Sequence, residues 1–346
     1  MFNVIIGKWY LKNKRDLPWR KSKNPYHVWL SEIILQQTRV AQGLPYFLKF
    51  TANFPTVFDL ANADENTVLK LWQGLGYYSR ARNLHFSAKY IKNELNGVFP
   101  NNYKNLLQLK GVGDYTASAI ASICFNEPTA VVDGNVYRVL SRYFGIKTPI
   151  NSSAGIKEFK KLAQQLIDTK EPGTYNQAIM DFGATLCKPQ NPLCNECPFA
   201  DSCVALEKNL ITTLPIKEKK LNIKKRYFNY LVIITENAST VIEERTGKGI
   251  WQGLYQFPLI ESKTPIFEDA LVNTPEFKKY IPHTANIRLF NTTDIIHKLS
   301  HQHLYTKFWI VNTQKVNVKT IQYNTIQNYP VPALIAKHLN SFFKQA

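Results

Sequence analysis

The sequence has no long hydrophobic run and few acidic residues. Its longest apolar stretches, such as Tyr230 to Thr235, are too short and too interrupted to cross a bilayer, which excludes a membrane-spanning protein. Only 25 Asp and Glu residues oppose 43 Lys and Arg residues, so the net charge is +18. We therefore expect an acidic partner, with nucleic acid as the first candidate. A solvated basic face without a partner is the alternative.

The chain also lacks an internal repeat and a low-complexity segment. We expect no signal peptide or organelle-targeting extension before it. We therefore expect a reducing compartment, and we assign the protein to a bacterial cytoplasm, associated with the nucleoid. Its 45% apolar and 13% aromatic residues are enough for packed cores rather than disorder. A length of 346 residues corresponds to about two domains.

Cysteine is scarce, yet four of the five cysteines lie in one short run with the spacing C-x6-C-x2-C-x5-C. They are Cys187, Cys194, Cys197 and Cys203. Four thiolates in a tight loop bind either a cubane iron–sulfur cluster or a zinc ion, and the unequal gaps resemble neither paired zinc knuckles nor the ferredoxin run. Two disulfides are the other alternative, which a reducing compartment disfavours.

Composition and periodicity change part-way along the chain. Up to about Leu210 the pattern is that of successive amphipathic helices, and from Tyr227 it is that of short strands. We assign residues 1–212 to an all-α domain, residues 213–226 to an exposed linker, and residues 227–346 to an α+β domain. The linker is rich in Lys and Arg, a composition that suits contact with phosphates. A helical pattern from Val331 to Phe343 closes the second domain.

A glycine-containing segment from Leu109 to Ala117 joins two helix-like segments. These segments, Asn101 to Leu109 and Tyr115 to Ile123, give the pattern of a helix–hairpin–helix. Gly111 and Gly113 can adopt a positive φ and carry no side chain, so their amides and the next helix N-terminus can approach a DNA phosphate. An ordinary turn is the alternative for a lone Gly-x-Gly.

Two carboxylates have surroundings suited to catalysis. Asp133 follows an apolar pair and precedes a helical segment from Val136 to Phe144, where capping the helix is the ordinary role of an Asp. Asn135 can orient this carboxylate. Glu32 stands in a largely apolar helical stretch from Trp29 to Thr38, and burial raises a carboxyl pKa. We predict that Glu32 is a general acid while Asp133 stays ionised.

These residues carry a close resemblance to the adenine DNA glycosylases of the MutY family, within the helix–hairpin–helix glycosylase superfamily. Besides the four cysteines, the matching segments are Leu17–Arg20, Ser31–Thr38, Trp72–Leu84, Leu109–Ala117, Val132–Val136 and Asn176–Ala184. The resemblance implies base excision repair: hydrolysis of the N-glycosidic bond of adenine mispaired with 8-oxoguanine or guanine in double-stranded DNA.

The same resemblance implies roles for individual residues. In that family the cysteine run holds a [4Fe–4S] cluster, so the four cysteines are its ligands, whereas Cys124 is a small core residue. By analogy, Glu32 protonates adenine and Asp133 stabilises the oxocarbenium ion of the sugar. Tyr115 and Asn135 support Asp133.

Further residues are assigned to DNA by analogy. The pocket for the flipped adenine comprises Trp19, Arg20, Leu35 and Asp181. The probes of the partner strand are Gln37, Thr38, Leu75 and Tyr77, with Tyr77 as a wedge between stacked bases. Core packing is the alternative for Trp19 and Leu35, and helix-end packing for Leu75 and Tyr77.

The residue after the hairpin predicts whether the strand is also cut. Bifunctional relatives that resemble endonuclease III have a lysine there, which forms a Schiff base with the sugar. This sequence has Tyr115 at that place, and Lys110 lies on the other side of Gly111. We therefore predict a monofunctional glycosylase without an efficient lyase step. We separately expect a monomer.

The second domain resembles, more faintly, the Nudix-like lesion-recognition domain of the same family, through the segment Gly249–Pro258. The carboxylate array that holds magnesium in a Nudix hydrolase is missing between Leu259 and Tyr280, so hydrolysis by this domain is not expected. Leu299, Ser300 and His301 fall where the family has a Phe-Ser-His loop that contacts oxidised guanine. The leucine departs from that pattern, and strand-edge packing is the alternative for the three residues.

Two other functions fit parts of the sequence. One is a related glycosylase for another lesion, which Tyr115 and the recognition domain disfavour. The other is a nucleotide-pool hydrolase or a non-catalytic DNA-binding protein. The missing Nudix array argues against the hydrolase, and the presence of Glu32 and Asp133 argues against a purely binding role.

Overall fold

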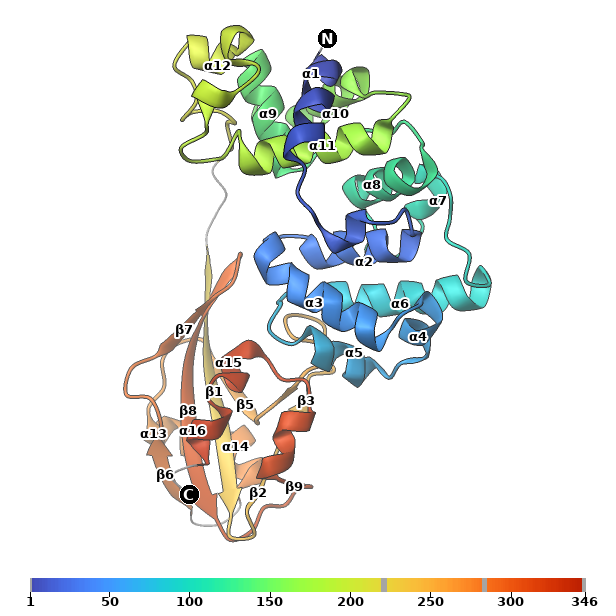
Figure 1. Ribbon diagram of the computed structural model, residues 1–346. Helices are drawn as coiled ribbons and strands as arrows, with labels where there is room; N and C mark the ends of the chain where they lie inside the picture. Colours follow the sequence, from blue (N-terminus) through green and yellow to red (C-terminus); the bar gives the residue numbers. More distant parts are fainter. Residues whose placement is uncertain (1, 219–222, 282–284, 344–346) are drawn as a thin grey trace. The chain divides into compact units, whose positions relative to one another are not determined.

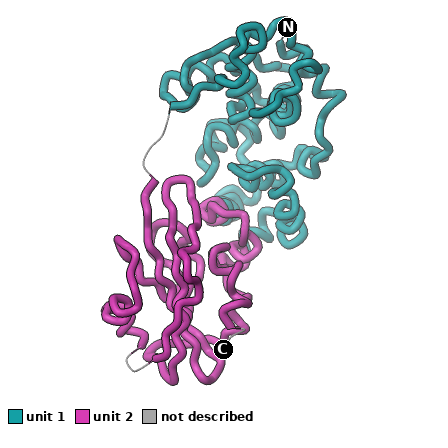
Figure 2. The backbone as a smooth tube through the Cα atoms, turned by 90° about the vertical axis from the view of Figure 1, so that its left-hand side faces the viewer, with its two compact units in different colours: residues 1–62, 83–220 teal, residues 63–82, 221–346 magenta. Residues whose placement is uncertain are grey.

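The computed structural model describes residues 2–218, 223–281 and 285–343. The chain divides into two compact units (Figure 2), which are described separately below. The first unit comprises residues 1–62 and 83–220, and the second comprises residues 63–82 and 221–346.

The first unit is built from helices (Figure 1). Its elements are α1 (Phe2–Asn13), η1 (Pro18–Arg20), α2 (Pro25–Leu35), α3 (Val40–Asn53), α4 (Val57–Asn62), α6 (Ser79–Glu94), α7 (Tyr103–Leu106), α8 (Asp114–Phe125), α9 (Gly134–Phe144), α10 (Ser153–Leu166), α11 (Pro172–Thr185), η2 (Cys194–Glu196), η3 (Ala200–Ser202) and α12 (Val204–Glu207). The first turn of α6 belongs to the second unit. Helix α11 packs against α1, α8 and α9, and α2 packs against α3 and α8.

Local sequence signals explain where the helices near the site begin and end. Asn24 accepts a hydrogen bond from the amide of Tyr26 and caps α2, with Pro25 at its first position. Helix α9 begins after Asp133, and its last turn ends at Gly145, whose φ of 68° suits a residue without a side chain. The predicted segments at the hairpin are confirmed as α7 and α8, although α7 is shorter than expected.

The second unit contains a mixed sheet and short helices. Its main strands are β1 (Lys224–Thr235), β5 (Leu259–Ser262), β6 (Asn286–Leu289), β7 (Ile295–Lys298) and β8 (Gln302–Thr313). The order is β5-β1-β8-β6, and β7 also pairs with β8. Strands β1 and β8 run parallel along their full length, from Lys224 opposite Gln302 to Thr235 opposite Thr313. The other pairings in this sheet are antiparallel.

Short elements complete this unit. They are α5 (Glu65–Trp72), β2 (Ser239–Thr240), β3 (Glu243–Glu244), β4 (Tyr255–Gln256), α13 (Glu268–Val272), α14 (Pro275–Tyr280), β9 (Ile321–Gln322), η4 (Tyr323–Asn328), α15 (Ala333–Ala336) and α16 (Leu339–Phe342). Leu231, Ile233, Trp309 and Val311 from the two long strands pack with Phe277 of α14 in one core. The predicted α+β class is confirmed, but the helical pattern from Val331 to Phe343 forms two short helices rather than one.

The segment of residues 63–82 packs with the sheet domain in the second unit. Lys70 Nζ donates to the carbonyl of Tyr329 at 3.0 Å, and Arg82 Nη1 donates to the carbonyl of Gln252 at 2.6 Å. Gly253 lies against Leu69, with a φ of 78°. These contacts attach α5 and the turn after it to the sheet domain.

The basic linker differs at both ends from the expected exposed segment. At its start, the carbonyl of Leu214 accepts from Arg142 and the carbonyl of Ile216 accepts from the amide of Ile150. At its end, Lys224, Lys225 and Arg226 belong to β1. Its residues 219–222 lie outside the described residues. No helix in the described part of the chain is long and apolar enough to cross a membrane.

Candidate active site

A cavity of about 520 Å³ in the first unit collects most of the predicted catalytic and base-binding residues. We call it the catalytic cavity. The predicted residues that line it are Trp19, Arg20, Glu32, Leu35, Thr38, Tyr115, Asp133 and Asn135. They come from η1, α2 and the turn after it, α8 and the start of α9. The fold therefore brings together residues that are as much as 116 positions apart, from Trp19 to Asn135.

Glu32 lies on α2 among apolar residues and is 8% exposed. Burial raises the pKa of its carboxyl to about 7, and the negative charge of Asp133 acts in the same direction. A hydrogen bond from Tyr115 and the charge of Arg20 oppose this rise. Glu32 can thus hold a proton near neutral pH and give it to a group in the cavity.

We predict that Glu32→Gln stabilises the folded protein above neutral pH. The pKa of Glu32 is about 7 in the fold, against 4.5 for an exposed Glu. At pH values below the lower pKa, Glu32 is protonated in both the folded and the unfolded state, so its carboxyl does not change the free energy of unfolding. As pH rises through this window, only the unfolded state gains a free carboxylate, and stability falls. Gln avoids that loss, so we expect a gain of about 3 kcal/mol near pH 8 and almost none near pH 4.

Urea unfolding at the two pH values measures this difference. Glu94→Gln at the end of α6 is the matched control, because Glu94 is exposed, lies outside the cavity lining and loses one carboxylate in the same way. A gain for Glu32→Gln that does not depend on pH would contradict the elevated pKa.

Asp133 combines the two roles that the sequence left open. It caps α9, because Oδ1 accepts from the amides of Asn135 at 2.9 Å and Val136 at 2.8 Å. Its carboxylate also lines the catalytic cavity, where Oδ2 accepts from Asn135 Nδ2 at 2.7 Å. Burial is the largest influence and leaves the pKa of Asp133 raised, while these hydrogen bonds and the charge of Arg138 oppose the rise. The donors can stabilise the carboxylate form of Asp133 at the cavity.

Tyr115 stands at the start of α8, close to both carboxyl groups. Its hydroxyl hydrogen-bonds to Glu32 and lies 3.1 Å from Met180 Sδ. Burial and the charges of Glu32 and Asp133 raise its pKa well above the usual value. Tyr115 thus stays neutral and can donate a hydrogen bond to a carboxylate.

Asp181 does not line the catalytic cavity but holds two arginines that do. Arg20 donates to both of its oxygens, at 2.6 and 2.8 Å, and Arg15 Nε donates at 2.9 Å. Burial alone raises the pKa of Asp181, but hydrogen bonds from the two arginines outweigh it and lower the pKa. Asp181, which is fully buried, therefore fixes the guanidinium groups at the wall of the cavity.

Arg138 connects the start of α9 to the cysteine loop. Its Nη2 donates to Asn135 Oδ1 at 2.8 Å and to the carbonyl of Gly183 at 2.7 Å. Its Nε donates to the carbonyl of Cys187 at 2.8 Å. Because Asn135 in turn donates to Asp133, a continuous chain of hydrogen bonds runs from the first cysteine to the cavity carboxylate.

The four cysteines of the run lie in the loop after α11, all of them free and half-buried. Burial and the nearby Cys187, Cys203 and Cys194 raise the pKa of Cys197 to about 11. Four cysteine sulfurs in one loop are the donor set of a [4Fe–4S] cluster. Arg142 Nη1 also points to Cys187 Sγ at 3.5 Å and can donate to a ligating sulfur.

The hairpin before α8 fits backbone contact with a phosphate, with one correction. Gly111 has a φ of 87°, as expected. Gly113 does not take a positive φ, because it is the extended residue that precedes α8. Gly113 is exposed and a side chain there would meet nothing within 4 Å, so a ligand can approach its backbone closely.

The predicted probes of the partner strand lie in different surroundings. Gln37 is exposed with a φ of 54°, and Thr38 lines the catalytic cavity. Leu75 is only 5% exposed, so its side chain is packed rather than available as a probe. Tyr77 is 49% exposed and has a φ of 47°, which suits a wedge more than helix-end packing.

Leu299, Ser300 and His301 form the turn between β7 and β8 in the second unit. Ser300 and His301 are exposed, so strand-edge packing does not account for them, whereas Leu299 is half-buried. The hydroxyls of Ser300 and Tyr77 lie 2.6 Å apart. The turn is therefore joined to the exposed tyrosine within the same unit.

Several residues of the site were not predicted from the sequence. Arg15, Gln177, Met180 and Ala184 also line the catalytic cavity. The last three, together with Asp181, lie at positions spaced by three and four along α11, so they share one helix face. That periodicity was present in the sequence and could have identified them.

Comparisons with known proteins place this geometry in a family. Residues 30–165 match the model of the helix–hairpin–helix superfamily of base excision DNA repair proteins, residues 187–203 match the iron–sulfur binding domain of endonuclease III, and residues 229–341 match a NUDIX domain. The adenine DNA glycosylase of Buchnera aphidicola subsp. Baizongia pistaciae is 36% identical over 331 residues, which cover 94% of this chain and 91% of that protein.

The chain belongs to the adenine DNA glycosylase family. A rat member is 47% identical over 213 residues, covering 59% of this chain and 41% of that protein. Among solved structures, a thermostable thymine-DNA glycosylase is 31% identical with a TM-score of 0.56, and it covers 60% of this chain and 95% of its own.

These findings confirm the resemblance inferred from the sequence. The protein is an enzyme that hydrolyses N-glycosyl bonds, as the family does. Its cofactor is a [4Fe–4S] cluster, bound in the region of the cysteine loop. The helix–hairpin–helix and Nudix-like domains of the predicted fold are both confirmed.

Proposed function

We propose that this adenine DNA glycosylase removes adenine paired with 8-oxoguanine or guanine in double-stranded DNA, as a monofunctional, monomeric enzyme. The observation that carries the proposal is the pair of carboxyl groups in one cavity, Glu32 with a pKa of about 7 and Asp133 among hydrogen-bond donors. A carboxyl group that holds a proton near neutral pH and a second carboxylate held by hydrogen-bond donors are the groups that N-glycosidic hydrolysis of a poor leaving group needs. The family names of the relatives support adenine as the base.

The chemistry then proceeds in two steps. Glu32 gives its proton to N7 of adenine, and the C1′–N9 bond breaks with its electron pair retained by the base. The positive charge that develops on C1′ and the ring oxygen faces the carboxylate of Asp133, which stabilises it. Water adds to C1′, and its proton passes to Glu32, which restores the starting state.

The cavity walls provide the binding energy that a flipped base requires. Trp19 and Leu35 are apolar, and Trp19 is held edge-on by Phe47 at 5.1 Å between ring centroids. Gln177 offers an amide to the edge of the base. Unstacking costs a few kcal/mol, and less for a mispaired base. A mispaired adenine is therefore the base that enters most readily.

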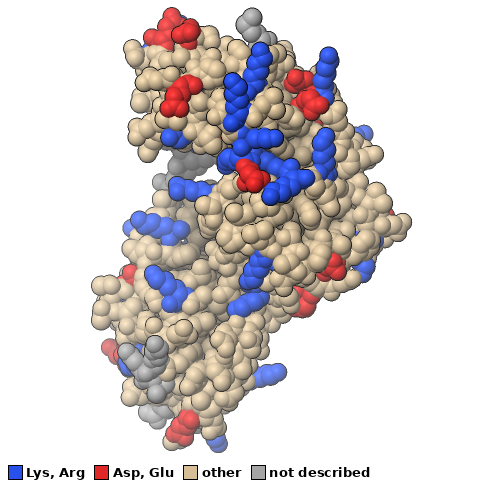
Figure 3. Space-filling view, in the orientation of Figure 1, with Lys and Arg blue, Asp and Glu red and all other residues tan. Residues whose placement is uncertain are grey.

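Basic side chains and backbone amides account for binding to DNA. Lys and Arg side chains gather in the middle of the helical unit on the face drawn in Figure 3, with few acidic side chains among them. The exposed backbone at Gly113 and the hairpin with Gly111 add phosphate contacts. The cysteine loop that would hold the cluster lies in the same unit.

Free adenine is the product that tests this proposal. A duplex with adenine opposite 8-oxoguanine is incubated with the cluster-loaded protein, and the released base is identified by chromatography. We expect free adenine in equal amount to alkali-labile sites in the adenine strand. Release of a base other than adenine together with the alkali-labile sites would contradict the proposal. The absence of alkali-labile sites in protein that keeps its cluster would also contradict it.

We predict that borohydride traps little of the protein on DNA. A lyase step needs an amine that forms a Schiff base with the sugar, and Tyr115 occupies the place beside the hairpin that such an amine needs. Trapping is compared between this chain and a Tyr115→Lys variant. A strong covalent adduct with the unchanged chain that disappears in a single Lys→Ala variant would contradict monofunctional cleavage.

We predict that Ser300→Ala reduces the preference for 8-oxoguanine over guanine. The change removes the hydroxyl that contacts Tyr77 and would face the oxidised base. The expected loss is about tenfold in the ratio of base-release rates, corresponding to one hydrogen bond. Thr293→Ala, another exposed position in the second unit, is the matched control. An unchanged ratio for Ser300→Ala would remove this turn from lesion recognition.

A glycosylase for another lesion is the second candidate, favoured by the likeness to a thymine-DNA glycosylase. That structure covers only 60% of this chain, so it does not account for the whole of the second unit. Duplexes with thymine opposite guanine distinguish the two candidates.

A further inference from the structure

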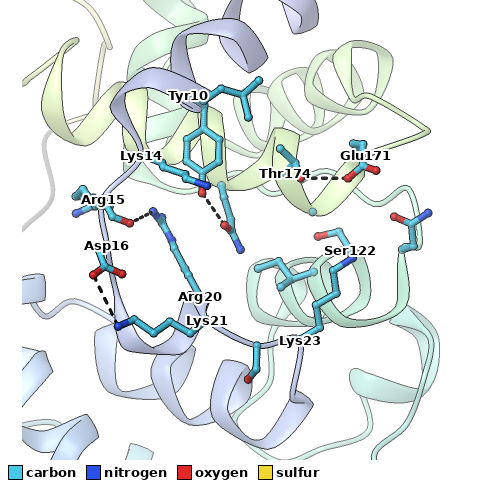
Figure 4. A pocket seen from close by; sticks show the side chains of 16 residues that line it. Tyr10, Lys14, Arg15, Asp16, Arg20, Lys21, Lys23, Ser122, Glu171 and Thr174 are labelled. Carbon is cyan, nitrogen blue, oxygen red and sulfur yellow. Dashed lines mark hydrogen bonds and ion pairs between the residues drawn. The ribbon is translucent and has the colours of Figure 1, made fainter.

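A second cavity, of about 550 Å³, lies in the first unit beside the catalytic cavity. We call it the rear cavity. Figure 4 shows Tyr10, Arg15 and Arg20 on one side of it, and Ser122 and Thr174 on the other. It is large enough for a free nucleobase. Of the predicted catalytic residues Glu32, Tyr115, Asp133 and Asn135, none lines it.

The two cavities follow one another along the same two helices. On α8, Tyr115 lines the catalytic cavity, Ser122 lines the rear cavity, and Ile123 lines both. On α11, Met180 lines the catalytic cavity and Thr174 the rear cavity. The change from one cavity to the other thus occurs over about two turns of each helix.

The shared wall consists of residues with long side chains. Arg15, Arg20, Ile123 and Gln177 line both cavities. Gln177 Oε1 accepts from the hydroxyl of Tyr10, a residue of the rear cavity, at 2.7 Å. Rotation of a side chain such as Gln177 takes far less time than a catalytic turnover. Because Asp181 holds Arg15 and Arg20 in ion pairs, Gln177 is the polar residue of this wall whose side chain can rotate without breaking one.

The rear cavity has a basic lining in which part of the charge is paired. Five basic residues line it: Arg15 and Arg20 are both paired with Asp181, Lys21 lies 3.8 Å from Asp16, and Lys14 and Lys23 leave the lining net positive. Glu171 adds a negative charge. Hydroxyl and amide groups make up the other polar lining, and such groups bind the donors and acceptors of a purine edge.

We infer that the rear cavity is the exit for the freed purine base, an inference that rests on the proposed function. The sugar of the target nucleotide must lie at Asp133, so the base extends toward Glu32 and the shared wall. The DNA strand covers the opposite side after cleavage. The base moves past Gln177 into the rear cavity and leaves while the strand with the abasic site stays bound.

Filling the rear cavity tests this exit. Thr174→Trp places an indole at the start of α11, and Ser22→Trp does so from the loop before α2, so the two variants act from different segments. Lys161→Trp, exposed on α10 and outside both cavities, is the matched control. The visible absorbance of the cluster reports folding for each variant.

The measurement uses excess enzyme and a duplex whose target adenine carries a radioactive label. Alkali treatment gives the rate of bond cleavage, and filtration that retains protein-bound DNA gives the rate at which free adenine leaves. For the unchanged chain and the control, we expect adenine to pass the filter as fast as abasic sites form. For both tryptophan variants, cleavage stays unchanged and passage of adenine slows at least about tenfold.

The outcomes separate the exit from the proposed function. If adenine from the unchanged chain stays with the complex until the abasic strand dissociates, the exit is wrong. The exit is also wrong if free adenine passes the filter as fast with both tryptophan variants as with the control. If no abasic sites form in the unchanged chain, the proposed function itself fails.

Discussion

Asp133→Asn is expected to lower the rate of adenine release about a thousandfold while DNA binding changes little. An amide cannot balance the positive charge of the sugar, and loss of a single stabilising group at the reacting atoms costs about this much. Asn is itself a good helix cap, so its oxygen can still accept from the amides of Asn135 and Val136. The fold around α9 should therefore survive.

Single-turnover base release and equilibrium binding to an uncleavable duplex measure the two effects separately. Asp168→Asn, in the turn before α11, is the control because it removes the same charge outside the cavity lining. If Asp133→Asn loses binding in parallel with activity, the carboxylate matters for the fold alone. A rate close to that of the control would leave Asp133 as a cap without a catalytic role.

Arg138→Met is expected to reduce both cluster retention and base release. Arg138 is 8% exposed, and its guanidinium group donates to the carbonyls of Cys187 and Gly183 and to the side chain of Asn135. Methionine fills part of the space but leaves these acceptors without a donor, which costs about 3 to 5 kcal/mol of stability. Asn135 then loses the partner that orients it toward Asp133.

Arg138→Lys keeps the charge but cannot reproduce the fork of donors, so an intermediate effect is expected. Cluster absorbance, the thermal unfolding midpoint and single-turnover base release are measured on each variant. The comparison with Asp133→Asn is decisive, because that variant should lose activity and keep its cluster. Full cluster content and normal base release in Arg138→Met would show that this hydrogen-bond chain does not connect the two sites.

The sequence predicted the parts of the site that local pattern determines. Asp133 was recognised both as a helix cap and as a carboxylate for the cavity, and its bonds to Asn135 and Val136 match a cap. The buried position of Glu32 followed from its apolar neighbours on α2. The turn at Gly111 required a residue without a side chain. All of these depend on residues within one or two turns of each other.

The sequence did not reveal contacts that depend on distant segments. Asp181 was expected in the base pocket, but it lies behind the wall, because Arg15 and Arg20 surround it. Arg138 reaches Cys187, which is 49 positions away, and no periodicity signals such a pair. The closing helical pattern showed which residues are buried, including Phe342, but not that the helix is interrupted near His338. Tertiary packing decides these features.

The most direct test of the account is single-turnover base release from matched duplexes with adenine opposite 8-oxoguanine, guanine or thymine. Strand cleavage is scored before and after alkali. We expect alkali-dependent cleavage of the adenine strand that is fastest opposite 8-oxoguanine, slower opposite guanine and absent opposite thymine. Equal rates for all three duplexes, or no release by protein that keeps its cluster, would contradict the proposed function.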